Sequence, residues 1–125
     1  MTFQKKLSLF LKVKCLLTVN SGSSANLVAF STLTSPKLKE RAIKKGDEVI
    51  TVAASFPTTV NPIIQNGLKP VVVDVDLQTL DANPQLLEEA ISSKTRAIMM
   101  AHTLGNPFDL DTVQRLCKEN NLWLI

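Results

Sequence analysis

Short apolar runs rich in β-branched residues alternate with segments of helical periodicity, and this alternation limits the fold more than any other feature of the sequence. Strands are expected at residues 15–19, 48–53, 71–76, 95–101 and 122–125, and helices at residues 25–33, 35–43, 56–66, 83–91 and 109–120. Strands that are apolar on both faces and separated by helices are typical of a covered parallel sheet. The sequence therefore predicts an α/β fold with a mostly parallel sheet and helices on both faces.

The composition excludes several classes of protein. The chain has 125 residues, 45% of them hydrophobic and 20% charged, which is enough for one domain with a core. The net charge of +3 comes with scattered lysines, and only 5% of the residues are aromatic. No nucleic-acid partner is therefore expected.

The N-terminal segment and the cysteines bear on localisation. A lysine pair followed by the apolar run 7–11 resembles a signal peptide, but Lys12 and Lys14 interrupt the run too early. Four apolar residues instead share one helical face: Phe3, Leu7, Phe10 and Leu11. Cys15 and Cys117 lack metal-ligand spacing, and Cys117 lies on an apolar helical face where a buried thiol is expected. We therefore expect a cytoplasmic protein with an amphipathic N-terminal helix and no membrane partner.

A serine-rich turn, Ser21-Gly22-Ser23-Ser24, joins the first expected strand to an apolar helix. The start of a helix directs unpaired N–H groups and the positive end of its dipole at one place. Gly22 would let the backbone approach a ligand closely, and the serine hydroxyls would add donors. This pattern predicts a phosphate site, although it is neither a P-loop nor a dinucleotide fingerprint. An ordinary serine N-cap is the alternative.

Other polar and aromatic residues follow the remaining expected strands, where ligands of open parallel sheets bind. Phe56 is placed to project over that edge as a flat platform, or else to fill the core at a helix start. Asp74 and Asp76 lack a third ligand, so a solvated strand end is favoured and no metal site is expected. His102 is the single histidine, and a polar residue that merely ends a strand is its alternative role.

Five ordered motifs resemble the DegT/DnrJ/EryC1/StrS family of vitamin B6-dependent sugar-nucleotide aminotransferases, from about Phe10 to Ile125. They are Asn20–Asn26, Gly46–Ile50, Val72–Asp76, Ala90-Ile91 with Lys94–Ile98, and Ala101–Gly105. The resemblance implies part of the large domain of a fold-type I transferase dependent on pyridoxal phosphate (PLP). It also implies that Gly22, Ser23 and Ser24 hold the phosphate of the cofactor, and that Phe56 stacks on its ring. His102 and Thr103 would lie beside the cofactor and substrate.

Within the family, the sequence is most similar to the CDP-4-keto-6-deoxyglucose 3-dehydratase branch of lipopolysaccharide (O-antigen) and deoxysugar biosynthesis. The similarity rests on Ser21–Asn26, the expected helix after Ser35, and the segments 56–62 and 105–108. It implies pyridoxamine phosphate (PMP) as cofactor, a histidine in place of the usual lysine, and an iron–sulfur cluster in the full-length parent. A sugar-nucleotide substrate, a homodimer and a separate reductase partner are implied as well.

The sequence stops at Ile125 inside the last expected strand, 122–125, which leads us to expect a fragment of a longer protein. Residues 1–125 would form a partial cofactor-binding large domain that lacks its N-terminal segment and everything after that strand. The resemblance places the catalytic residues downstream of Ile125, so the chain alone is expected to be inactive. A PLP-dependent aminotransferase of the same family and a non-catalytic truncated product are the alternatives. A dinucleotide-binding domain is disfavoured because its glycine-rich turn is missing.

Overall fold

The computed structural model describes residues 2–125 and contains helices, short 3₁₀ segments and one sheet. In chain order the elements are α1 (Phe3–Phe10), α2 (Gly22–Thr32), η1 (Pro36–Arg41), β1 (Glu48–Val52), α3 (Pro57–Gln65), β2 (Lys69–Val73), α4 (Pro84–Glu89), β3 (Thr95–Ile98), η2 (Thr103–Gly105), α5 (Leu110–Glu119) and β4 (Trp123–Leu124). Helices and strands alternate from β1 onward, which is the order that the sequence pattern predicts.

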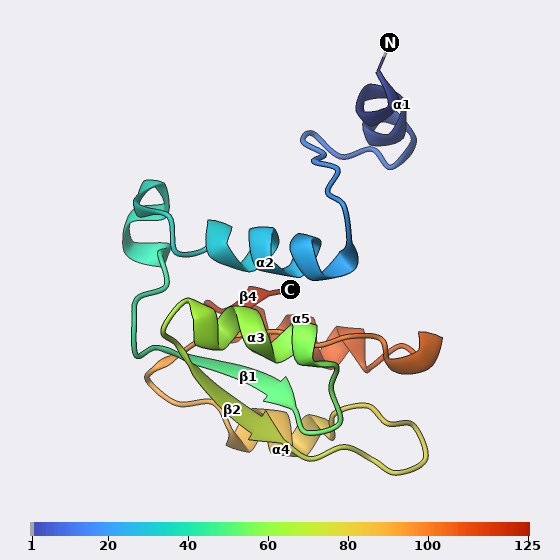
Figure 1. Ribbon diagram of the computed structural model, residues 1–125. Coiled ribbons are helices and arrows are strands. Elements are labelled where there is room, and N and C mark those ends of the chain that lie inside the picture. Colours follow the sequence, from blue (N-terminus) through green and yellow to red (C-terminus); the bar gives the residue numbers. More distant parts are fainter. Residues whose placement is uncertain (1) are drawn as a thin grey trace.

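The four strands form one all-parallel sheet in the order β2-β1-β3-β4. Helices α2 and α3 cover one face, and α4 and α5 cover the other (Figure 1). On β1, Val49 lies in the cluster with Phe30 of α2 and Ile63 of α3. Its neighbour Ile50 faces the opposite way, into the cluster that contains Leu116 of α5. The predicted α/β fold with a parallel sheet covered on both faces is therefore confirmed.

One expected strand is absent. Residues 15–19 have no regular secondary structure and pair with no strand among residues 2–125, and Leu17 is 69% exposed. They belong to an arm that leads from α1 to α2 and lies apart from the sheet (Figure 1). A strand gains its backbone hydrogen bonds only from a neighbouring strand, and the arm has no neighbouring strand within residues 2–125. The prediction of a strand at 15–19 is therefore wrong for this chain.

Other boundaries shift for local reasons. The helix expected at 25–33 begins at Gly22, because Ser21 already caps it, and the strand expected at 71–76 spans Lys69–Val73. The segment expected as a helix over 35–43 is the short 3₁₀ helix η1, interrupted at Lys39, where φ is +53°. Gly67 ends α3 with φ of +73°, as predicted.

Helix α1 is amphipathic as predicted, but none of its eight residues is buried. Phe3 is 70% exposed and Phe10 is 82% exposed. The apolar face of α1 therefore meets no other part of residues 2–125 that would bury it. No helix in this described part of the chain is long and apolar enough to cross a membrane.

Candidate functional site

The serine-rich turn forms the start of α2. Ser21 is the N-cap, and its hydroxyl oxygen accepts the backbone N–H of Ser24 at 3.2 Å. The Ser24 hydroxyl donates to Oδ1 of Asn20 at 2.6 Å and accepts the Ser21 hydroxyl at 3.1 Å. The predicted N-cap therefore exists, and it consumes the donors of Ser21 and Ser24 in local bonds.

Two backbone N–H groups and one hydroxyl group at the start of α2 remain available to bind a ligand. Within residues 2–125, the N–H groups of Gly22 and Ser23 and the Ser23 hydroxyl have no hydrogen-bond acceptor. A Cβ built on Gly22 would meet no atom within 4 Å, so the space beside this glycine is open. Unpaired N–H groups at the positive end of a helix dipole suit a phosphate. The residues present therefore fit a phosphate group.

A cavity of about 170 Å³ lies beside this turn, between α2 and α3. Its lining residues come from both helices, and most of them are of polar type: Ser23, Ser24, Leu27, Thr58, Asn61, Pro62 and Gln65. Asn61 and Gln65 were not singled out from the sequence, since a polar residue on a helix gives no sign of which cavity it faces.

Phe56 is the residue that precedes α3, and its backbone is extended there. Its side chain is 74% exposed, so the core alternative is wrong. Pro57 occupies the first turn of the helix, where its missing N–H costs nothing. The aromatic ring is therefore free to serve as a stacking surface, although it lines neither the cavity beside α2 nor the one that contains His102.

His102 follows β3 and stacks on Phe108, with ring centroids 4.4 Å apart and an interplanar angle of 28°. Phe108 is buried in the core, so it fixes the plane of the more exposed imidazole. Thr103, the next residue, is half-buried in η2. The contact with Phe108 could not be predicted from the sequence, because the two residues are joined by an irregular loop.

A second cavity, of about 430 Å³, contains His102. Asn26 of α2 and Thr59 of α3 line it too, together with Phe108 and Ile125. The predicted site residues are therefore divided: Ser23 and Ser24 line one cavity and His102 lines another. The N-terminal halves of α2 and α3 contribute to both.

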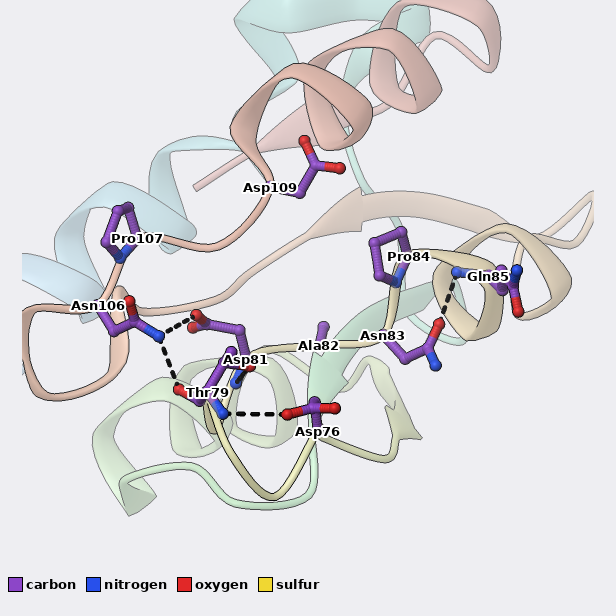
Figure 2. A pocket seen from close by; sticks show the side chains of 10 residues that line it. All are labelled: Asp76, Thr79, Asp81, Ala82, Asn83, Pro84, Gln85, Asn106, Pro107 and Asp109. Carbon is purple, nitrogen blue, oxygen red and sulfur yellow. Dashed lines mark hydrogen bonds between the residues drawn. The ribbon is translucent and has the colours of Figure 1, made fainter.

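Figure 2 shows a third cavity, of about 510 Å³, between the loops that follow β2 and β3. Asn106 donates from Nδ2 to the Thr79 carbonyl and to Oδ2 of Asp81, both at 3.0 Å, and so joins the two loops. Asp76 accepts the N–H groups of Gln78 and Thr79, which lower the pKa of its carboxyl group.

Asp74 and Asp76 are both exposed, as expected for a solvated strand end. Asp74 accepts the N–H of Val75 at 2.8 Å, so each carboxylate stabilises the local backbone turn. No group of three or more His, Cys, Asp or Glu side chains in residues 2–125 is placed to hold a metal ion.

Comparison with known proteins assigns the chain to a family. The profile of the DegT/DnrJ/EryC1/StrS aminotransferase family matches residues 1–125. The chain belongs to this family. Its members are PLP-dependent enzymes, dehydratases and aminotransferases among them, and the expected family is therefore confirmed.

Two curated relatives match almost the whole chain. Lipopolysaccharide biosynthesis protein RfbH of Salmonella typhimurium is 62% identical over 123 residues, which is 98% of this chain and 28% of RfbH. The dTDP-4-dehydro-2,6-dideoxy-D-glucose 3-dehydratase of Saccharopolyspora spinosa is 53% identical, over 98% of this chain and 27% of that enzyme. The chain thus spans under a third of the length of these relatives.

Solved structures agree with the sequence comparison. E. coli GDP-4-keto-6-deoxy-D-mannose-3-dehydratase with bound hydrated PLP superposes with a TM-score of 0.86 at 35% identity. The similarity covers 97% of this chain and 31% of the enzyme. The expected fold, part of a fold-type I PLP-dependent enzyme, is confirmed.

Proposed function

We propose that residues 1–125 supply the phosphate-binding part of the large domain of a 3-dehydratase that removes the C3 hydroxyl of a 4-keto-6-deoxy sugar nucleotide. The free N–H groups of Gly22 and Ser23, with the open space in front of Gly22, are the observation that carries this proposal. The 62% identity to RfbH and the 53% identity to a 3-dehydratase support this reaction. CDP-4-keto-6-deoxyglucose is the substrate we propose.

The residues of this chain would bind and orient the cofactor, which is PMP or PLP. Gly22 and Ser23 would hold its phosphate with their free donors. Ser24 would join them by exchanging its hydroxyl bond to Asn20 for one to the phosphate. Phe56 would stack on the cofactor ring. His102 and Thr103 would lie beside the cofactor and the sugar, with Phe108 fixing the imidazole plane. The bound cofactor would supply the electron sink that loosens bonds at the neighbouring sugar carbon.

The remaining parts of the site would come from polypeptide beyond residues 1–125. These parts include the acidic partner of the pyridine nitrogen, the catalytic base and the cysteines of an iron–sulfur cluster. The whole enzyme would be a cytoplasmic homodimer served by a reductase. Residues 1–125 form only part of a large domain in this proposal, so we expect no catalysis by the chain alone.

The first test addresses the phosphate site. Ser23→Ala should weaken PMP binding by about 1–2 kcal/mol, since a charge-assisted hydrogen bond is lost. Ser8→Ala in α1 is the matched control, because Ser8 is only half-buried and its hydroxyl donates only to the Lys5 carbonyl. Calorimetric titration with PMP measures both variants. Equal affinity of Ser23→Ala and wild type would refute the role of the Ser23 hydroxyl.

The second test separates dehydration from amination. A dehydratase that uses a histidine base should yield no cofactor–lysine adduct after borohydride reduction of the full-length protein. It should also release the C3 hydroxyl only when PMP and a reductase are present. A pyridoxyl-lysine peptide would instead assign the protein to the aminotransferases, with the same phosphate site.

A further inference from the structure

We propose that Asn26 is a positioning residue that sets the distance between the phosphate-binding turn and the Phe56 ring. The Nδ2 group of Asn26 donates to the backbone carbonyl of Thr58 at 3.2 Å. Asn26 lies in α2, one turn after Gly22, and Thr58 lies in the first turn of α3, two residues after Phe56. This bond therefore joins the two elements of the proposed cofactor site, on which the inference rests.

The sequence of α3 explains why the Thr58 carbonyl needs a donor from outside its own helix. In a regular helix, the N–H of residue 62 would bond to this carbonyl, but residue 62 is proline. Proline has no N–H, and its ring crowds the carbonyl four residues earlier. An unpaired carbonyl in this half-buried place would be costly, and the Asn26 amide supplies the missing donor.

A second bond at the other end of the same helix pair provides a comparison. Asn66, after α3, donates from Nδ2 to the Ser31 hydroxyl at 3.4 Å and to the Pro62 carbonyl at 2.7 Å. Ser31 lies five residues after Asn26, which is roughly 7.5 Å along the helix axis. The Asn66 bond therefore ties α2 to α3 away from the phosphate-binding turn.

The location of Asn26 distinguishes a positioning role from simple helix packing. Thr58 lines the cavity beside Ser23 and Ser24, while Asn26 and Thr59 line the cavity that contains His102. The Asn26–Thr58 bond thus lies at the boundary of the two cavities. Holding a ligand site in its binding geometry before the ligand arrives raises affinity.

The experiment compares PMP affinity and helix stability in matched variants. Asn26→Ala should weaken PMP binding by about fivefold, the range expected for one hydrogen bond. Asn66→Ala should change PMP affinity less than about twofold, although it removes the same kind of side chain. In a Phe56→Ala background, Asn26→Ala should have no further effect on affinity, because the ring that it positions is gone.

Pro62→Ala separates the two functions of Asn26, which are to pair the Thr58 carbonyl and to join α2 to α3. An alanine at position 62 restores an N–H for the Thr58 carbonyl within α3, so Asn26→Ala should then cost no α3 stability. Amide exchange at residues 58–61 and 63–65, which carry an N–H in every variant and are measured without cofactor, reports that rescue. PMP affinity should stay low in Asn26→Ala/Pro62→Ala, because the bond between the two helices is still missing. If Asn26→Ala alone fails to fold, this double variant is compared with Pro62→Ala instead.

The outcomes distinguish this inference from the function on which it rests. Failure of the folded wild-type chain to bind PMP would overturn the proposed phosphate site. Wild-type binding with equal affinities of Asn26→Ala and Asn66→Ala would overturn the positioning role alone. Rescue of both exchange and affinity by Pro62→Ala would also overturn it, since Asn26 would then only satisfy a carbonyl.

Discussion

Two five-residue segments of this protein have similar sequences but differ in secondary structure and burial. Residues 15–19 read Cys-Leu-Leu-Thr-Val, and β1 reads Glu-Val-Ile-Thr-Val. The second segment lies between β2 and β3 with its last four residues buried. The first has no regular secondary structure, is unpaired within residues 2–125 and is largely exposed. The contrast shows that β-propensity records how well a side chain fits a sheet, and that a neighbouring strand is required for the sheet to form.

The largest expected effect comes from truncating equivalent apolar side chains in the two segments. Ile50 is fully buried between β2 and β3, so Ile50→Ala should lower the free energy of unfolding by roughly 2–5 kcal/mol. Leu17 is 69% exposed, so Leu17→Ala should change it by less than about 0.5 kcal/mol. Urea unfolding followed by circular dichroism measures both. Equal losses would mean that the arm packs against the body of the protein in solution.

The same comparison shows how far a sequence predicts this fold. From β1 to β4, each expected strand has a parallel neighbour within the chain, and each formed. Their ends were harder to predict: β2 ends at Val73 because the Asp74 carboxylate accepts a local backbone N–H, and β3 ends at Ile98 although Met99 and Met100 still bond to the neighbouring strands. The strand expected at 15–19 failed because the sequence does not reveal that residues 2–125 offer it no partner.

The candidate site was predictable to a similar degree. The serine-rich turn was identified because glycine and serine at a helix start have a clear physical meaning, and the structure gives it free donors. The Asn26–Thr58 bond spans 32 residues and depends on Pro62, so it requires the three-dimensional pairing of α2 with α3. The His102–Phe108 stacking likewise depends on a loop whose path the sequence does not specify.

The two cysteines allow the arm and the body to be compared in one experiment. Cys15 lies in the arm and is exposed, whereas Cys117 is buried in the core, and this burial raises the pKa of its thiol. Only the thiolate reacts with a disulfide reagent, so Cys15 should react at least about a hundredfold faster than Cys117. Stopped-flow measurement with such a reagent should show one fast thiol in wild type and no fast thiol in Cys15→Ser. Two fast thiols would show that the core around α5 opens readily.

Acidic pH should affect the arm and the body of the protein differently. This is the smallest of the three effects predicted for these two regions. The arm and the preceding helix α1, together residues 2–20, contain no aspartate or glutamate. In the body, hydrogen bonds from the Gln78 and Thr79 N–H groups lower the pKa of Asp76, and those from Thr112 lower the pKa of Asp109. A carboxyl group whose pKa is lower in the folded state stabilises that state above its unfolded pKa, near 4, and loses this contribution as the pH falls through its folded pKa.

Asparagine substitutions isolate this contribution, because asparagine keeps the acceptor oxygen of the turn or helix cap and does not titrate. Wild type should be more stable than the Asp76→Asn/Asp109→Asn double variant at pH 7, and the difference should shrink as the pH falls from about 4 toward about 2. Thermal unfolding across this range, with the arm followed separately by NMR, measures both regions. A stability difference that stays constant with pH would show that the two carboxyl groups titrate alike in the folded and unfolded states. The Asp76 turn and the Asp109 cap would then stabilise the folded state through hydrogen-bond geometry alone, without a contribution from charge. The uncharged caps Ser21 and Asn83, at the starts of α2 and α4, act in the same way.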